Sequence, residues 1–317
     1  MKKTSVRIGI LGGGGISDTH ARAARAIAGV QVVAVHGANR DKVAALAKSA
    51  GATAYDDLDG FLAHPMDVVA IGSPSGVHAE QASAAVRRGL HVLVEKPLDI
   101  TTKRIDALIE EADRARVKVG VFFQDRLTPD LVEMKAKIDA GVLGTPVLAS
   151  GRVKWYRPPE YYGDSRWRGT WRLDGGGVLM NQAIHTIDAL LWLFGPVARV
   201  SGCVATRLHQ IEVEDTAAAL IEFTNGAYGM LEASTAAFPG LPRRIEATGS
   251  KGTLVHEQEA RPAVVADASG HQRVFEDFFT AIATGRAPAC DAREGRRSVA
   301  LVEAIYESAR TGGAVAP

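Results

Sequence analysis

The sequence predicts an α/β protein of two domains, the first built on a doubly wound parallel sheet. Three observations carry this prediction. The chain has 317 residues, more than one hydrophobic core usually supports. In its first third, short apolar runs alternate with longer amphipathic, alanine-rich stretches, which is the rhythm of βαβ units. Glycines at 12–15 follow the first apolar run, where a first strand would turn into a helix.

The strands and helices of the first domain follow from composition and periodicity. Strands covered on both faces read as continuous apolar runs, whereas helices show apolar residues three and four apart. The expected strands are Val6–Leu11, Val30–Val35, Val68–Ile71, His91–Val94 and Val117–Phe122. The expected helices are Thr19–Ala28, Arg40–Ala50, Ala79–Arg88 and Lys103–Arg114.

The second part of the chain predicts another α/β unit. The last apolar strand run of the first part ends just before Gln124–Arg126, so we expect domains at 1–124 and 125–317. A helix over Pro129–Val142 should precede a second sheet, and the final helices should return to the first domain. The expected strands of the second sheet start near 145 and continue at 198–205, 216–223, 227–234 and 244–249.

Composition excludes several classes of function. Lysine and arginine number 37 against 36 acidic residues, so no net field recruits nucleic acid or an anionic membrane. The apolar run at 189–195 is too short to span a bilayer. Cys203 and Cys290 lack the spacing of a metal site or disulfide framework, which favours a reducing, cytoplasmic location. The expected partner is a small molecule or another subunit.

The glycine-rich turn is the first candidate binding site. Gly12 and Gly14 match the first two glycines of a dinucleotide fingerprint, and Ser17 stands in place of the third. Gly15 and Ile16 would then open a helix whose free N–H groups attract a pyrophosphate. The alternative is a plain flexible turn.

The end of the second strand leaves the choice between NAD and NADP open. An acidic residue usually holds the ribose hydroxyls of NAD there, but this chain has Gly37 and Ala38. Asn39 and Arg40 follow, and they could bind the 2′-phosphate of NADP. The alternative is that Arg40 merely begins a solvated helix.

Several further motifs occur in order along the chain. Ser73–Pro74 and His78 follow the third expected strand, and Glu95–Lys96–Pro97 follows the fourth. Arg126, GGGVLMNQAIHTID at 175–188 and GSKGTL at 249–254 come later. Together these motifs resemble the Gfo/Idh/MocA family of nicotinamide-dependent sugar and polyol oxidoreductases, and the likeness runs nearly from end to end.

The resemblance implies a fold and a reaction. The fold would be an N-terminal Rossmann domain followed by a C-terminal α/β domain with an open, mostly antiparallel sheet. The reaction would be hydride transfer between NAD or NADP and a secondary hydroxyl of a sugar, inositol or nucleotide-sugar, without metal. Two alternatives stay open: redox-neutral elimination or glycoside cleavage with an internally recycled NAD, and a cofactor-binding sensor without catalysis.

The resemblance also implies roles for single residues. Lys96 would stabilise the developing alkoxide and His185 would be the acid/base, a task that suits a near-neutral imidazole. The peptide before Pro97 is commonly cis in the family, and an X–Pro bond makes that isomer accessible. Other residues are expected around the cofactor or the substrate. Ser73, Pro74 and Lys96 are expected to contact the cofactor. His78 would either contact it or cap the helix that starts at Ala79, and Glu95 would meet a cofactor ribose or its neighbour Lys96. Arg126 is a substrate contact.

Helical spacing in the segment after Gly175–Gly177 places Asn181, His185 and Asp188 on one face, where Asn181 and Asp188 could bind substrate. Many family members have aspartate at position 181. An amide there could orient a substrate but could not act as a base.

The segment 153–176 concentrates tryptophan, tyrosine and arginine. Aromatic faces pack against sugar rings, and guanidinium groups pair with carboxylates or phosphates. Trp167 and Arg168 are therefore candidate substrate contacts, and an interface loop is the alternative.

Two further expectations concern metals and assembly. Seven other histidines lack metal-ligand spacing and receive no chemical role: His20, His36, His64, His91, His209, His256 and His271. An open sheet with one apolar face usually needs covering, so a homodimer or homotetramer through the second sheet is expected.

Overall fold

The computed structural model describes residues 5–259 and 267–317. These residues divide into two compact units. The first unit comprises the described residues of 1–99, 103–127 and 264–295, and the second comprises those of 100–102, 128–263 and 296–317. The change of unit after Leu127 lies close to the expected boundary at 124. Residues 267–295 lie within the expected second domain of 125–317 by sequence, but they belong to the first unit.

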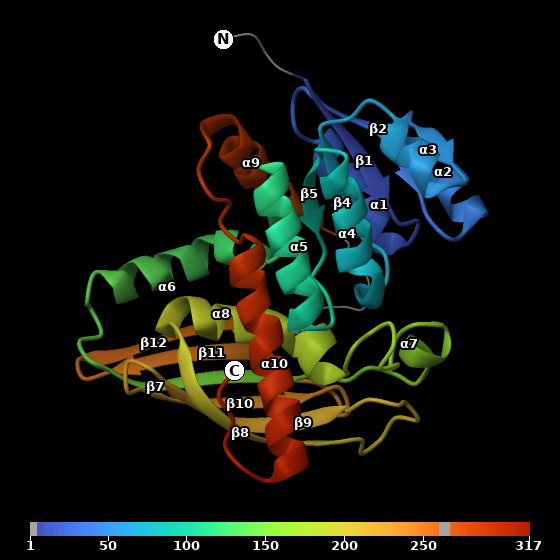
Figure 1. Ribbon diagram of the computed structural model, residues 1–317. Helices are drawn as coiled ribbons and strands as arrows, with labels where there is room; N and C mark the ends of the chain where they lie inside the picture. The colour runs from blue at the N-terminus through green and yellow to red at the C-terminus, as the bar shows by residue number, and fades with distance from the viewer. Residues whose placement is uncertain (1–4, 260–266) are drawn as a thin grey trace. The chain divides into compact units, whose positions relative to one another are not determined.

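The first unit contains a six-stranded parallel sheet in the order β3-β2-β1-β4-β5-β6 (Figure 1). Its strands are β1 (Val6–Leu11), β2 (Val30–His36), β3 (Thr53–Tyr55), β4 (Val68–Ile71), β5 (His91–Val94) and β6 (Val119–Val121). This order confirms the doubly wound sheet. The sequence missed β3, because its three residues lie at the sheet edge and form no apolar run.

Helices accompany this sheet, and one of them comes from far along the chain. They are α1 (Gly15–Arg25), α2 (Arg40–Ala50), α3 (Leu58–Ala63), α4 (His78–Arg87), α5 (Thr102–Ala115) and α9 (Ser269–Thr284), with 3-10 turns η1 (Ser75–Val77) and η2 (Gln124–Leu127). Phe275 and Phe278 of α9 are fully buried and join Ile8, Leu93 and Phe122 in one core cluster. Burial of these rings explains why α9 belongs to the first unit.

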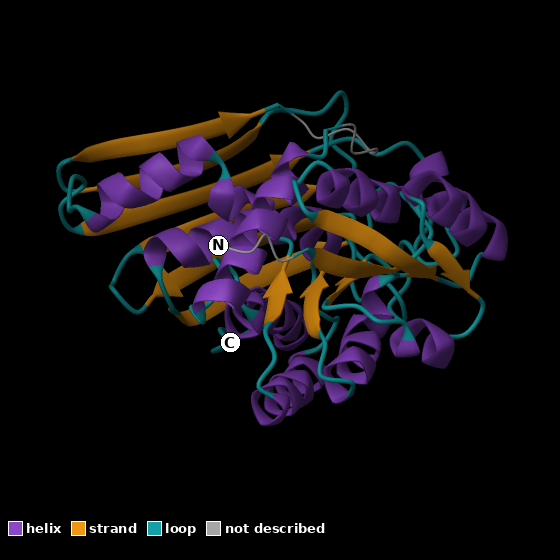
Figure 2. Cartoon of the chain, turned by 90° about the horizontal axis from the view of Figure 1, so that it is seen from above, coloured by secondary structure: helices purple, strands orange, loops and turns teal. Residues whose placement is uncertain are grey.

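The second unit contains a six-stranded mixed sheet in the order β12-β11-β7-β10-β9-β8 (Figure 1). Figure 2 shows the strands of both sheets in orange. Its strands are β7 (Pro146–Lys154), β8 (Val197–Ala205), β9 (Thr216–Phe223), β10 (Tyr228–Ser234), β11 (Arg243–Gly249) and β12 (Gly252–Gln258). Only the β7–β10 pair among these strands is parallel, so the expected, mostly antiparallel sheet is confirmed.

The helical segments of the second half are α6 (Pro129–Asp139), α7 (Glu160–Gly163), the π-helical turn η3 (Val178–Ala183), α8 (Ile184–Phe194) and α10 (Ala292–Thr311). The first turn of α10 belongs to the first unit and the rest to the second. Side chains along β9 alternate between buried and exposed, the period of a sheet with one covered face. In the same sheet, α8 packs against β7 and β11, and η3 packs against β9 and β10.

Two expectations from composition can be compared with the structure. Cys203 and Cys290 are both free thiols. Within the described part of the chain, no helix has the length and apolar character required to cross a membrane.

Replacing Phe278 tests the attachment of α9. Phe278→Ala should lower the free energy of unfolding by about 3–5 kcal/mol, because it removes a fully buried ring from a packed core. Guanidinium denaturation measures this change. Phe238→Ala is the matched control, since that ring is 79% exposed and its loss should change stability little. Equal stability of the two variants would contradict the packing described here.

Candidate active site

The turn after β1 leaves its outer side open. A Cβ atom at Gly12 would overlap Ser17 Oγ and lie 2.8 Å from Gly72 O, so the turn passes tightly beside the end of β4. Cβ atoms at Gly14 and Gly15 would meet nothing within 4 Å. No side chain caps α1, whose first N–H groups can therefore bind an anion. The residues present fit the pyrophosphate of a dinucleotide.

The loop after β2 separates the two residues expected to bind a 2′-phosphate. The Asn39 side-chain oxygen accepts a hydrogen bond from Lys42 N at 3.0 Å and caps α2. Its predicted cofactor contact is therefore revised to a helix cap. The Arg40 side chain is 78% exposed and lies 3.4 Å from Asp56, a weak surface pairing that leaves it able to bind another anion. A Cβ at Gly37 would lie 3.1 Å from Gly12 C, so an acidic side chain at 37 would crowd the turn.

His78 joins two loops. Its Nδ1 lies 2.8 Å from Pro97 O and its Nε2 lies 2.8 Å from Ser73 O. The side chain is buried, and both of its polar atoms are used. His78 therefore positions the neighbouring backbone, and its contact with the cofactor stays a prediction. Ser73 Oγ donates to Gln81 Oε1 at 2.6 Å, and Pro74 precedes η1.

The Glu95–Lys96–Pro97 segment follows β5 and is held by a buried carboxylate. Glu95 Oε1 lies 3.1 Å from His20 Nε2 and 3.0 Å from His271 Nε2. Glu95 Oε2 accepts the Lys96 backbone N–H at 3.1 Å. Burial opposes ionisation, yet the hydrogen bonds from the two imidazoles hold the pKa of Glu95 well below its usual value. The Lys96–Pro97 peptide is cis.

These contacts bear on three expectations. Both oxygens of Glu95 are engaged within the first unit, and of its two expected contacts the one with Lys96 is present. His20 and His271, which received no chemical role from the sequence, converge on this carboxylate. No local pattern marks them, because their partner is far away in the chain.

Arg126 is buried in η2, where Nη2 donates to Glu294 Oε2 at 3.0 Å and Nη1 donates to Ala289 O at 3.3 Å. Both partners belong to the first unit. Arg126 therefore fixes the start of α10, and its contact with a substrate stays a prediction.

In the second unit, a buried carboxylate organises the glycine turn. A Cβ at Gly177 would overlap the carbonyl oxygen of Glu214, so only glycine fits at this approach. Glu214 accepts hydrogen bonds from Gly177 N at 3.0 Å, Leu179 N at 2.9 Å and the Tyr306 hydroxyl. Burial raises the pKa of Glu214, and these hydrogen bonds oppose that rise. The carboxylate thereby anchors the start of η3.

The segment from 178 to 188 departs from the expected single α-helix. Its first part, η3, is a π-helical turn, and α8 begins only at Ile184. π-helical turns are rare in proteins, but those that occur often lie at functional sites. Asn181 Nδ2 donates to Asp174 Oδ1 at 2.7 Å, and Asp174 is buried and also accepts Gly169 N. A carboxylate thus stands beside the amide that replaces the common aspartate.

His185 and Asp188 differ in accessibility. His185 is the second residue of α8 and retains a small exposed surface. Asp188 is fully buried, and Ser298 Oγ donates to its Oδ1 at 3.3 Å. Asp188 therefore holds α10 against α8, and its contact with a substrate stays a prediction.

The loop before η3 gathers arginine and aromatic side chains. The guanidinium of Arg168 lies 4.5 Å from the Tyr161 ring centre and 5.2 Å from that of Trp167. The guanidinium of Arg157 lies 5.4 Å from the same Tyr161 ring. Arg168 Nε is buried without a hydrogen-bond partner among the described residues. The guanidinium groups of Arg157 and Arg168, both over the Tyr161 ring, could together bind an anionic group of a ligand.

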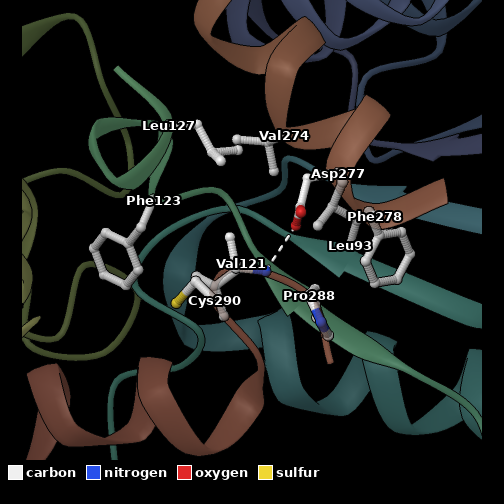
Figure 3. Close-up of a pocket in the computed structure, with 10 residues that line it drawn as sticks. Leu93, Val121, Phe123, Leu127, Val274, Asp277, Phe278, Pro288 and Cys290 are labelled. Carbon is white, nitrogen blue, oxygen red and sulfur yellow. Dashed lines mark hydrogen bonds between the residues drawn. The ribbon is translucent and has the colours of Figure 1, made fainter. Parts of the chain in front are cut away.

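The cavity drawn in Figure 3 is not a ligand site. It lies in the first unit between β6, α9 and the segment 288–290, and its volume is about 10 Å³. That volume holds about one water molecule. Its wall is mostly apolar, and Asp277 accepts Ala289 N at 2.7 Å across it. We interpret it as a packing seam.

Comparison with known proteins covers both units. Residues 6–123 match the oxidoreductase family with an NAD-binding Rossmann fold, and residues 131–255 match the GFO/IDH/MocA C-terminal domain. The chain is 25% identical to myo-inositol 2-dehydrogenase of Thermotoga maritima over 96% of each protein. It is 30% identical to an oxidoreductase of Synechocystis over 80% of this chain and 72% of that protein.

Among solved structures, the chain is similar to the WlbA dehydrogenase of Bordetella pertussis, crystallised with NADH and UDP-GlcNAcA. The TM-score is 0.93 and the identity 31%, over 99% of this chain and 98% of that one.

Proposed function

Because the chain belongs to the Gfo/Idh/MocA family of NAD-binding oxidoreductases, we propose that it oxidises a secondary hydroxyl group of a sugar derivative, or reduces the corresponding ketone. The cofactor is NAD or NADP. The residues that would hold it are Gly12, Gly14 and Gly15 at the turn after β1, with Arg40 beside the adenosine ribose. The bound nicotinamide supplies or accepts the hydride.

The observation that carries this proposal is the fixed backbone around Lys96. Ligands of parallel sheets bind at the carboxyl ends of the strands, and Lys96 follows the carboxyl end of β5. Glu95 binds the Lys96 amide, and His78 binds Pro97 O. The backbone is thus fixed both at Lys96 and at the following residue. A catalytic lysine needs such a fixed backbone, because its positive charge must be accurately placed.

Lys96 and His185 have distinct proposed roles. Lys96 would stabilise the negative charge that develops on the hydroxyl oxygen, and His185 would take the hydroxyl proton. Asn181, oriented by Asp174, would hold a second substrate hydroxyl.

The substrate class is proposed from the arginine and aromatic side chains of the second unit. Tyr161 and Trp167 would pack against a sugar ring, and Arg157 and Arg168 would bind a carboxylate or phosphate. The relative that was crystallised with UDP-GlcNAcA supports a nucleotide-linked sugar acid.

Removing either catalytic group tests the mechanism. Lys96→Ala and His185→Ala should each lower kcat by about 10²–10⁴-fold while NADH still binds. A panel of sugars, inositols and nucleotide-sugars, assayed with NAD and NADP by nicotinamide absorbance, measures this. Lys103→Ala is the control, since Lys103 is exposed in the same unit. A wild-type protein that oxidises no panel member would contradict the proposal.

Arg40 provides a test of cofactor choice. Arg40→Ala should raise KM for NADP by about tenfold and leave KM for NAD nearly unchanged, because only NADP carries the 2′-phosphate and a charge-assisted hydrogen bond to it contributes about 1.4 kcal/mol or more. Steady-state kinetics with both cofactors measure the difference. Equal effects on the two would exclude Arg40 from phosphate binding.

We also propose a homodimer or homotetramer formed through the outer face of the second sheet. Leu148, Leu220, Tyr228 and Met230 are each 45–52% exposed there. Leu148 pairs with Tyr228 and Leu220 pairs with Met230, so the four form one contiguous apolar patch. A second copy of this chain would cover such a patch.

A charge on this patch tests the assembly. Met230→Arg should shift the protein toward monomers, because an arginine at the centre of an apolar interface would be buried unpaired. Light scattering after size-exclusion chromatography measures the mass. Val142→Arg is the control, since Val142 is 53% exposed but lies outside the sheet. A wild-type monomer would refute the proposal.

A further inference from the structure

Three residues from distant parts of the chain meet in the interior of the first unit. His20 belongs to α1, Glu95 follows β5 and His271 belongs to α9. Their side chains are 0%, 9% and 3% exposed. The His20 ring stacks on Phe122 with centroids 4.4 Å apart, and the His271 ring lies 5.3 Å from Phe122. We call these three residues the His–Glu–His cluster.

The hydrogen bonds determine which protons the cluster carries. An ionised carboxylate oxygen only accepts, so His20 Nε2 and His271 Nε2 must both donate to Glu95 Oε1. His20 Nδ1 is buried and has no hydrogen-bond partner among the described residues. Burial lowers the pKa of His20, although Glu95 opposes this effect. His20 is therefore neutral, with its proton on Nε2.

The second oxygen of Glu95 connects the cluster to Lys96. Oε2 accepts the Lys96 amide, so the carboxylate spans from the two imidazoles to the backbone of the proposed catalytic lysine. We propose that His20 and His271 are positioning residues for Lys96, acting through Glu95. This inference rests on the role proposed for Lys96. Through His271, a helix from the last sixth of the chain would contribute to a site otherwise formed by the first third.

The same three side chains could be mistaken for a metal site. Their ligand atoms all lie within 4.8 Å of one another. Coordination through His20 Nε2 would move the ring proton to Nδ1, which would then be a buried donor without an acceptor. Such a donor is unfavourable. With Nε2 donating to Glu95, His20 Nδ1 carries a lone pair and no proton. The hydrogen-bonded arrangement therefore fits the structure better than metal coordination does.

The sign of the pH dependence follows from the groups around Glu95. They are His20 from α1, His271 from α9 and Lys96 beside it, while His78 of α4 influences His20. The pKa of Glu95 is depressed, so its contribution is present at neutral pH and is lost as pH falls through that low pKa. Removing one imidazole donor raises this pKa. The pH profile of the Lys96 amide signal in nuclear magnetic resonance, which unlike kcat does not depend on protonation of the base His185, should then show its acid limb at higher pH.

The test compares His271→Leu with His271→Gln in the full chain. The leucine variant loses the donor, and we expect kcat to fall about tenfold or more and the acid limb of the Lys96 amide signal to rise by about one pH unit. The glutamine variant retains an N–H donor and should restore the wild-type acid limb and most of kcat. If both variants lose activity equally with the wild-type acid limb unchanged, the proposal is overturned.

Glu95→Gln replaces the kinetic test if His271→Leu fails to fold. It keeps the shape of the side chain but cannot titrate, so it should abolish the acid limb that Glu95 produces. An unaltered acid limb in this variant would also overturn the proposal. His64→Leu is the control for loss of a histidine in the same unit, since the His64 side chain lies in a loop and bonds to the Tyr55 hydroxyl rather than to Glu95.

Nuclear magnetic resonance separates this inference from the proposed function. Two protected imidazole N–H signals are expected in the wild type, and His271→Leu should remove one and shift the Lys96 amide signal, whereas His271→Gln should leave that amide nearly unshifted. An unshifted Lys96 amide in His271→Leu would refute the positioning role even if sugars are oxidised. Elemental analysis is the last measurement: a stoichiometric metal lost in His271→Leu would replace this inference with a metal site.

Discussion

The interaction on which the nucleotide-binding unit depends is the burial of one ionised carboxylate. A buried charge is tolerated only when hydrogen bonds and opposite partial charges compensate it. Glu95 receives that compensation from His20 in α1, from His271 in α9 and from the Lys96 amide. These contacts tie the end of a central strand to segments near both ends of the chain. They explain, together with the buried phenylalanines of α9, why residues 267–295 belong to the first unit.

The second unit uses buried carboxylates in a different way. Glu214 accepts two backbone amides at the start of the π-helical turn, and Asp174 accepts Gly169 N and the Asn181 amide. Backbone amides are donors that cannot titrate, so these contacts fix loop geometry, and the Tyr306 hydroxyl adds one further donor to Glu214. The first unit instead holds its carboxylate with imidazoles. The pKa of Glu95 is lowered by these imidazoles, whereas burial raises the pKa of Glu214.

Several residues recognised by their type have other tasks in the structure. Asn39 caps α2, His78 bridges two carbonyls, Arg126 holds the start of α10, and Asp188 binds Ser298. A motif identifies a residue that can bind a ligand. It does not show whether its polar atoms are already satisfied within the protein, because that depends on neighbours brought in by the fold.

The sequence by itself determined the parallel sheet, the glycine turn and the family, because continuous apolar runs, helical periodicity and clustered glycines are local patterns that secondary structure imposes directly. It also identified Lys96 at the end of β5 and the departure at Asn181. Only the tertiary structure decided that His20 and His271 share one carboxylate, that Asp174 stands beside Asn181, and that a π-helical turn precedes His185. The physical reason is range: a hydrogen bond between residues far apart in the chain requires folding to bring donor and acceptor together, and it leaves no period in the sequence.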